Sequence, residues 1–334
     1  MKPTLLIPAI FASFLLFGCG TKDASTSSTG GGPGPSSLKV GIVFDSGGRG
    51  DKSFNDSAWM GVEKAQKELG IEVKTIDSKT AKDYEGNLAG MADAGMDVIV
   101  AVGVSQGDAL KVVAAKYPTI KFGLVDGSLD LQNVRGLTFK EEQGSYLAGY
   151  LAALVSKTKK IGFVGGMNMP LIKKFEVGYS AGAKAADPKV QFLPAKYTES
   201  WDDVSLGKAA ALVLFNGGAD IVYHAAGRCG IGVIDAAAET NHFAIGVDGD
   251  QDGVKPGNVL TSMVKHVDVG VFDLIKDVKD GKFTPGAKVY DLKSGGVGLT
   301  DFQFTKDVIG EANIKKVEDV KAKIISGEIL VPNH

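Results

Sequence analysis

The stretch that decides the fold is Lys39-Val-Gly-Ile-Val-Phe-Asp45, followed closely by Asp51-Lys-Ser-Phe-Asn-Asp-Ser-Ala-Trp-Met60. The first part reads as an apolar strand that ends in a carboxylate, and the second leads into an amphipathic helix over 58–69. In an open α/β sheet, ligands bind outside the carboxyl ends of the strands. We therefore expect Asp45, Phe54 and Asn55 to lie together at a ligand-binding edge. None of these side chains is a nucleophile beside a base, so the pattern favours binding over catalysis.

The chain continues as two rounds of alternating strands and helices. Strands are expected at 40–44, 73–76, 98–102, 122–125 and 134–139, and then at 160–164, 190–196, 220–223, 243–247 and 259–264. Helices are expected at 57–69, 84–94 and 107–117, and then at 175–186, 202–216 and 230–240. Short Val- and Ile-rich strands that alternate with longer helices are typical of parallel βαβ units. We predict an α/β protein with two doubly wound, Rossmann-like parallel sheets.

The two rounds repeat a short motif. Gly123-Leu-Val-Asp-Gly127 is matched by Gly246-Val-Asp-Gly249, and each is followed by Asn-Val and another apolar strand. Echoes this short also arise by chance in α/β proteins, but here they favour a duplicated domain with a cleft between the copies. Asp126 and Asp248 end their strands and are therefore expected at that cleft.

The N-terminus is typical of an exported, anchored protein. Residues 1–18 combine an early lysine with an apolar run that is too short to span a membrane. Leu16-Phe17-Gly18-Cys19 resembles the lipobox of bacterial lipoproteins, in which Cys19 is lipidated, for example with palmitate. The segment 19–37 is rich in Gly, Ser and Thr and reads as a flexible tether. An ordinary secretory signal with an incidental cysteine is the alternative. We expect a lipid-anchored body on the extracytoplasmic side of a membrane.

Composition excludes several classes of function. The 37 basic and 39 acidic residues nearly balance, which argues against a nucleic-acid partner. Beyond Cys19 the chain has a single cysteine, Cys229, so no intramolecular disulfide is expected in the mature body. The four histidines show no metal-ligand spacing. We expect no metal, no cofactor and a monomer.

Four blocks together resemble the basic membrane protein family of bacterial lipoproteins. They are the Asp51–Ala58 block, Pro170-Leu-Ile-Lys-Lys-Phe-Glu-Val-Gly178, Ile245-Gly-Val-Asp248 and Thr261-Ser-Met-Val-Lys265. The resemblance implies a substrate-binding lipoprotein that hands purine nucleosides, of the inosine, guanosine or adenosine type, to the permease of an ABC transporter. The chain departs from the family pattern at Phe17 and in the loop His224-Ala-Ala-Gly-Arg-Cys229.

The resemblance also implies the type I periplasmic binding protein fold, with two lobes joined by three crossovers. We assign 38–138 and about 266–284 to the N-terminal lobe, and 139–265 and about 285–334 to the C-terminal lobe. The crossovers are then expected near 136–143, 264–269 and 284–288.

The candidate ligand-binding residues suit a neutral nucleoside. A carboxylate accepts two hydroxyl hydrogen bonds, as the vicinal diol of a ribose requires, and Asp45, Asp126 and Asp248 together would repel a phosphate. Phe54 and Phe175 are expected to cover both faces of a planar base. We assign Lys265 to the ribose oxygens beside Asp248, Asn55 to the purine edge as donor and acceptor, and Gly227 of the 224–229 loop to the same site.

Other interpretations stay open at this point. Asp45 and Asp126 could cap turns, Phe175 could belong to the core, and Lys265 could be a solvated surface residue. A sugar receptor of similar fold is the first alternative function, since sugars also stack on aromatic rings. An exported nucleoside hydrolase is the second. It would group its carboxylates around calcium, whereas the three aspartates come from separate strands.

Overall fold

The computed structural model describes residues 37–334 of the chain. The predicted signal sequence, the Cys19 lipidation site and the tether up to Ser36 lie outside the described residues. Within 37–334, no helix is both long enough and apolar enough to cross a membrane.

The first sheet is wholly parallel and begins with the predicted Lys39–Phe44 strand. Its order in space is β12 (Gly286–Tyr290), β5 (Val134–Phe139), β4 (Lys121–Val125), β3 (Val98–Ala101), β1 (Lys39–Phe44) and β2 (Glu72–Asp77). The strands β1 and β3 are buried almost throughout, as expected of a parallel sheet that is covered on both faces.

The second sheet is parallel except at one edge. Its order is β13 (Val297–Leu299), β11 (Val259–Lys265), β10 (Phe243–Asp248), β9 (Ile221–Ala225), β6 (Lys160–Gly165) and β7 (Gln191–Phe192), with β8 (Lys196–Tyr197) also paired to β6. The edge strand β13 runs antiparallel to β11. The first sheet with its helices is called the first lobe below, and the second sheet with its helices the second lobe.

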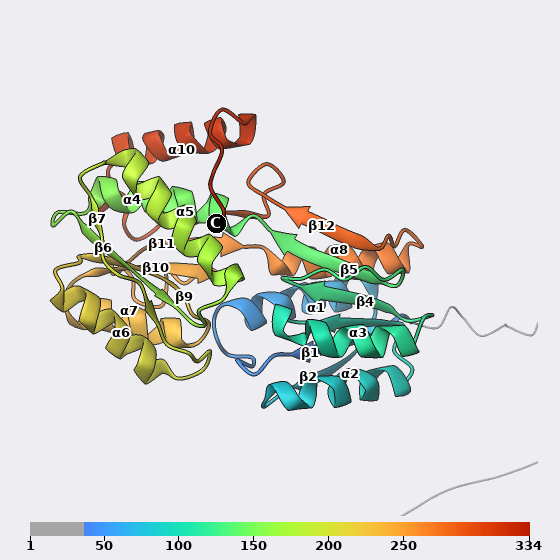
Figure 1. Ribbon diagram of the computed structural model, residues 1–334. Coiled ribbons are helices and arrows are strands. Elements are labelled where there is room, and N and C mark those ends of the chain that lie inside the picture. The colour runs from blue at the N-terminus through green and yellow to red at the C-terminus, as the bar shows by residue number, and fades with distance from the viewer. Residues whose placement is uncertain (1–36) are drawn as a thin grey trace, which may run out of the picture. The chain divides into compact units, whose positions relative to one another are not determined.

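Helices cover both faces of each sheet (Figure 1). In the first lobe they are α1 (Phe54–Leu69), α2 (Tyr84–Asp93), α3 (Gly107–Lys116) and α8 (Val267–Lys279), with short 3₁₀ turns η1 (Ala81–Asp83) and η2 (Val104–Gln106). In the second lobe they are α4 (Glu141–Val155), α5 (Pro170–Ala186), α6 (Val204–Asn216), α7 (Cys229–Glu239), α9 (Lys306–Ile309) and α10 (Glu311–Ser326). The pair α1 and α8 lies against one face of the first sheet, and α2 and α3 cover the other.

The prediction of two doubly wound lobes joined by crossovers is confirmed, but four α-helices were not predicted: α4, α8, α9 and α10. The predicted strand over 190–196 is interrupted, because Pro194 lacks the N–H that a continuous strand would donate. Helix α5 begins at Pro170, five residues earlier than expected, since proline fits the first turn of a helix.

The third crossover lies further along the chain than we expected. The strand β12 was assigned to the second lobe by sequence, yet it pairs with β5 along its whole length in the first sheet. The chain therefore leaves the first lobe at 291–296, and not at 284–288. The first two crossovers, at Lys140 and His266, fall where they were expected.

The three crossovers run side by side and bond to one another. The N–H of Lys140 donates to the Tyr290 carbonyl at 2.9 Å, and the N–H of His266 donates to the Gly296 carbonyl at 2.9 Å. In proteins whose domains close by a hinge, a few connecting residues of this kind absorb the change in angle.

Candidate functional site

A cavity of about 360 Å³ lies between the lobes, at the carboxyl ends of the strands of both sheets. Its volume is at the lower end of the range of small-molecule sites. All the predicted ligand-binding residues line it: Asp45, Phe54, Asn55, Asp126, Phe175, Gly227, Asp248 and Lys265. The sequence therefore located the cavity correctly, although the role of each side chain in binding a ligand stays a prediction.

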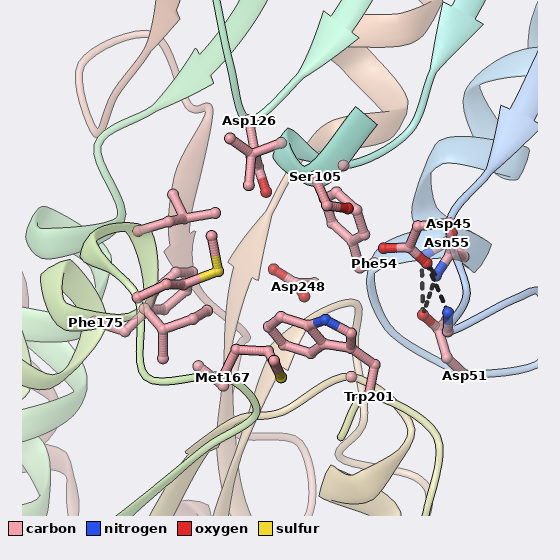
Figure 2. Close-up of a pocket in the computed structure, with 18 of the residues that line it drawn as sticks. Asp45, Asp51, Phe54, Asn55, Ser105, Asp126, Met167, Phe175, Trp201 and Asp248 are labelled. Atoms are coloured by element: carbon pink, nitrogen blue, oxygen red, sulfur yellow. Dashed lines mark hydrogen bonds between the residues drawn. The ribbon is translucent and has the colours of Figure 1, made fainter. Parts of the chain in front are cut away.

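One polar cluster of the cavity belongs to the first lobe and joins Asp45, Asp51 and Asn55 (Figure 2). The Asn55 Nδ2 group donates to Asp45 Oδ1 at 3.0 Å and to Asp51 Oδ2 at 3.1 Å. Asp51 in turn accepts the backbone N–H groups of Ser53, Asn55 and Asp56, which open helix α1. The cluster thus anchors a helix N-terminus to the cavity wall.

This arrangement changes the expected role of Asn55. We expected its amide to offer both a donor and an acceptor, but both donor hydrogens point at carboxylates. Asn55 Oδ1 has no hydrogen-bond partner among the described residues. Asp45 accepts from Gly47 and Asn55 at Oδ1, which leaves Oδ2 available. Burial raises the pKa of Asp45 to about 6, against the opposing hydrogen bond from Asn55.

A second polar cluster joins the lobes through Lys265. The Lys265 ammonium, at the end of β11, donates to Asp126 Oδ2 at 2.9 Å and lies 3.5 Å from Asp248 Oδ1. Asp126 belongs to the first lobe, whereas Lys265 and Asp248 belong to the second. Asp248 also accepts the hydroxyl of Ser53, from the first lobe, at 3.0 Å. The Oδ1 atoms of Asp126 and Asp248 have no hydrogen-bond partner within residues 37–334.

The matched motif of the two halves has the same backbone shape. Asp126 follows β4 with a φ of 64°, and Asp248 ends β10 with a φ of 62°. Aspartate tolerates this left-handed conformation better than most residues, because its short side chain bonds locally. The turn directs both carboxylates to the cavity, as the repeat in the sequence predicted.

Lys265 is a buried cation and not a surface lysine, since its side chain is only 2% exposed. Burial by itself lowers the pKa of Lys265, but the carboxylates of Asp126, Asp248 and Glu141 outweigh burial and raise it above its ordinary value. The ammonium also lies 4.7 Å from the centre of the Phe54 ring and 5.4 Å from that of Phe175. These are cation–π distances.

Phe54 and Phe175 face the cavity from opposite lobes (Figure 2). Phe54 is the first residue of α1, and Phe175 lies in the second turn of α5, because that helix starts earlier than predicted. Phe175 is 2% exposed, so it serves both the core and the cavity wall.

Sequence reasoning missed Trp201, whose indole forms a third aromatic wall in Figure 2. Trp201 precedes α6 in the polar stretch Thr198-Glu-Ser-Trp-Asp-Asp203, and a tryptophan in such a loop was the available signal. Its carbonyl accepts the N–H of Arg228 at 2.9 Å, which holds the 224–229 loop beside it. Gly227 has a φ of 54°, and a Cβ there would lie 3.1 Å from that carbonyl, so glycine suits this close approach.

His224 does not line the cavity but holds a strand end that does. Its Nε2 lies 3.0 Å from Gln251 Oε1, which also accepts the Val247 N–H at the end of β10. Burial lowers the pKa of His224 to about 4, so the imidazole is neutral at physiological pH. His224 and Gln251 therefore hold the strand end that carries Asp248.

The polar groups of the cavity are mostly carboxylates, joined by an amide and an ammonium. Within 37–334, no group of three His, Cys, Asp or Glu side chains is arranged to hold a metal ion. The two polar clusters and three aromatic walls of the cavity match a small ligand with a flat apolar part and hydroxyl or N–H groups.

Comparison with known proteins agrees with this view. Residues 38–334 match the Bmp family model, described as "ABC transporter substrate-binding protein PnrA-like". The chain is 36% identical to the ABC transporter nucleoside-binding protein BmpA of Lactococcus lactis, with 97% of each chain covered. It is 35% identical to basic membrane protein A1 of Borrelia garinii, with 98% of this chain and 96% of the other covered.

A solved structure has the same fold. An ABC transporter solute-binding protein from Aeropyrum pernix superposes with a TM-score of 0.82 at 30% identity, over 89% of this chain and 94% of that one.

The site also generates a prediction about stability. Glu141, the first residue of α4, is buried beside the crossover at Lys140, and its Oε1 has no hydrogen-bond partner among the described residues. Burial raises the pKa of Glu141 from 4.5 to about 7. The folded state then keeps a proton that the unfolded state has lost, so wild-type stability falls as the pH rises from about 4.5 to about 7.

We expect Glu141→Gln to raise the melting temperature by about 2 °C or more at pH 8, because the neutral amide avoids that cost. At pH 5, only slightly above the unfolded pKa of 4.5, most of that cost is absent and the gain should be much smaller than at pH 8. Thermal unfolding followed by circular dichroism at both pH values measures this. An equal shift at pH 5 and pH 8 would contradict the assignment.

Proposed function

Because the chain belongs to the Bmp family of PnrA-like ABC transporter substrate-binding proteins, we propose that it captures a purine nucleoside between its lobes and delivers it to a permease. The observation that carries this proposal is the cavity between the lobes, where aromatic rings from both lobes lie beside two separate carboxylate clusters. The name of the Lactococcus relative supports the same ligand class. The family is a transport component and not an enzyme, which removes the hydrolase alternative.

The aromatic residues support stacking of a base. Phe54 and Phe175 approach from opposite lobes, and Trp201 adds an indole at a third side. Stacking of a base on an aromatic ring contributes roughly 1–3 kcal/mol in nucleic-acid complexes. Sugars also stack on aromatic rings, so the preference for a nucleoside over a bare sugar rests on the second polar cluster beside the rings and on the nucleoside-binding relative.

The cluster around Lys265 supports recognition of a ribose. Asp126 Oδ1 and Asp248 Oδ1 accept no hydrogen bond from residues 37–334, although Asp248 Oδ1 lies 3.5 Å from the Lys265 ammonium, so each has acceptor capacity for one hydroxyl of a vicinal diol. Lys265 gives one bond to Asp126 and keeps donor capacity for a ribose oxygen. With Glu141 nearby, carboxylates outnumber this ammonium, so a phosphate would meet repulsion.

The cluster around Asn55 supports a particular base edge. With the Asn55 amide hydrogens given to carboxylates, Asn55 Oδ1 and Asp45 Oδ2 present acceptors only. Guanine and hypoxanthine carry an N–H donor at N1, whereas adenine carries an acceptor there. We propose that guanosine and inosine are preferred.

We further propose that the body is held outside the cytoplasmic membrane by lipid on Cys19. The short apolar run, the Gly18-Cys19 pair and the Gly- and Ser-rich segment support this.

The first prediction here separates the sugar from the base. Asp248→Asn should lower the affinity for inosine about tenfold or more and change the affinity for hypoxanthine little, because the lost charge-assisted bond goes to the ribose. Phe54→Ala should lower the affinity for both ligands by a similar factor, since stacking does not involve the sugar. Met60→Ala, an exposed position on the same helix as Phe54, is the matched control. Calorimetry with each purified variant provides the affinities.

Inosine monophosphate should bind the wild type poorly in the same experiment. Tight binding of the monophosphate, or an unchanged inosine affinity in Asp248→Asn, would place the ribose elsewhere.

The second prediction concerns the base edge and pH. Guanosine and inosine should bind about tenfold tighter than adenosine at pH 7.5, because their N1–H donates to these acceptors, whereas adenosine sets its N1 acceptor against them and keeps a donor only at its 6-amino group. As the pH falls through about 6, Asp45 gains a proton and guanosine affinity should fall, by up to about tenfold per pH unit. Calorimetry in the Glu141→Gln background removes a second buried carboxyl of the site, whose pKa burial raises to about 7.

Asp45→Asn should bind guanosine weakly and without this pH dependence. An adenosine preference, or the same pH profile in Asp45→Asn, would refute the assignment of Asp45 to the base.

The third prediction concerns the anchor. Protein expressed in bacteria supplied with labelled palmitate should carry the label, and Cys19→Ala should carry none. Cys229→Ala is the matched control and should keep the label, because the Cys229 thiol is buried in the second lobe. Label that persists in Cys19→Ala would show that the lipoprotein assignment is wrong.

A further inference from the structure

Arg228 makes a hydrogen bond that joins the two lobes outside the cavity. The Nη2 group of Arg228, in the second lobe, donates to the backbone carbonyl of Arg49, in the first lobe, at 2.6 Å. Neither residue lines the cavity, unlike Lys265 and Asp126, whose cross-lobe contact lies inside it. The bond therefore joins the lobes without being part of the ligand-contacting surface.

The acceptor is held in place by its own loop. Asp56 accepts the N–H of Gly50 at 2.7 Å and the N–H of Lys52 at 2.9 Å, which fixes the backbone on the far side of Arg49. The Arg49 side chain lies on the outer surface, where it pairs with Asp77 at 2.6 Å and lies over the Trp59 ring. Because the Arg49 side chain and the neighbouring backbone amides are held by these contacts, the Arg49 carbonyl is oriented toward Arg228.

Arg228, the donor, is also held in place by contacts of its own loop. The backbone N–H of Arg228 donates to the Trp201 carbonyl, and α7 starts at the next residue, Cys229. The Arg228 guanidinium passes close to the first-lobe loop, since a Cβ on Gly50 would lie 3.7 Å from Nη2. Its Nε is buried and has no partner among the described residues, so this half-buried guanidinium has lost part of its water and gains a bond to the Arg49 carbonyl instead.

We infer that Arg228 is a latch that holds the lobes closed and sets how long a ligand stays, without contacting the ligand. This inference rests on the proposed nucleoside-binding function. Opening the lobes must break the Arg228–Arg49 bond, and the partly dehydrated guanidinium makes that bond stronger than a neutral one. A contact present only in the closed state shifts the equilibrium toward it and slows escape of whatever the cavity encloses.

The position of the latch explains its coupling to the cavity. Arg228 is directly next to Gly227, which lines the cavity, and its backbone is tied to Trp201, which forms a cavity wall. On the other lobe, Arg49 lies between the cavity residues Gly47 and Asp51. Closure around a ligand and formation of the latch therefore bring the same two loops together.

Stopped-flow measurement of guanosine dissociation tests the latch, with tryptophan fluorescence as the signal because Trp201 lines the cavity. Arg228→Met should raise the dissociation rate about tenfold and change the association rate by less than about twofold. Arg228→Lys keeps a cationic donor and should recover part of the loss. Lys208→Met is the control, since it removes a cation that pairs with Glu239 inside the second lobe.

The outcomes separate failure of the latch from failure of the proposed function. Unchanged dissociation in Arg228→Met, with guanosine bound normally by the wild type, overturns the latch and leaves the proposed function intact. If the wild type binds no nucleoside, the proposed function fails, and small-angle scattering of the ligand-free proteins decides the latch. Arg228→Met should then have a larger radius of gyration than the wild type and Lys208→Met, and equal radii refute the latch. If Arg228→Met does not fold, Arg228→Gln replaces it in both measurements.

Discussion

The arrangement of the cavity depends on one buried cation. Lys265 ends β11, next to the edge strand β13 of the second sheet, and its ammonium pairs with Asp126 of the first lobe and Asp248 of its own lobe. A buried charge must be paired, because removing one partner leaves the other without water or counter-charge. Lys265 thereby ties the two lobes together and lies within cation–π distance of the Phe54 and Phe175 rings.

The polar character of the cavity depends on the carboxylates that surround the Lys265 ammonium. Asp126, Asp248 and Glu141 surround one ammonium, so the neighbourhood is acidic and accepts hydrogen bonds. The first-lobe cluster of Asp45, Asp51 and Asn55 is also acidic and joined by hydrogen bonds. A neutral ligand can satisfy both acidic clusters at once if it donates hydrogen bonds at each of its two ends and stacks on the aromatic rings between them. The Arg228–Arg49 bond adds closure from outside without altering this pattern.

Much of this arrangement was predictable because parallel sheets impose it. A strand that ends in Asp45, Asp126 or Asp248 presents the carboxylate at the cleft, and the repeat around Asp126 and Asp248 gave them the same backbone. Phe175 and Lys265 lie in blocks that resemble the family, whereas Gly227 was expected at the site from the 224–229 loop, where the chain departs from the family pattern. Lys265 was the hardest to interpret, since a lysine at a strand end is usually solvated and only its carboxylate neighbours keep it buried.

What escaped prediction depends on contacts between distant segments. Helix α4 has small and apolar residues on nearly every side, because it is packed on both faces, so it shows little amphipathic period. The strand Gly286–Tyr290 looks like part of the second lobe until its pairing with β5 is seen. The use of the Asn55 amide follows from Asp45, ten residues away, and the wall formed by Trp201 depends on a turn that no local pattern specifies.

The most direct test of the central claim is competition for the empty cavity. The protein is unfolded, freed of small molecules and refolded, and is then offered an equimolar mixture of guanosine, inosine, free purines, guanosine monophosphate, ribose and galactose. Mass spectrometry of what the washed protein releases on denaturation identifies the ligand. The account predicts about one guanosine or inosine per protein. Release of a sugar, a nucleotide or nothing from the mixture would contradict it.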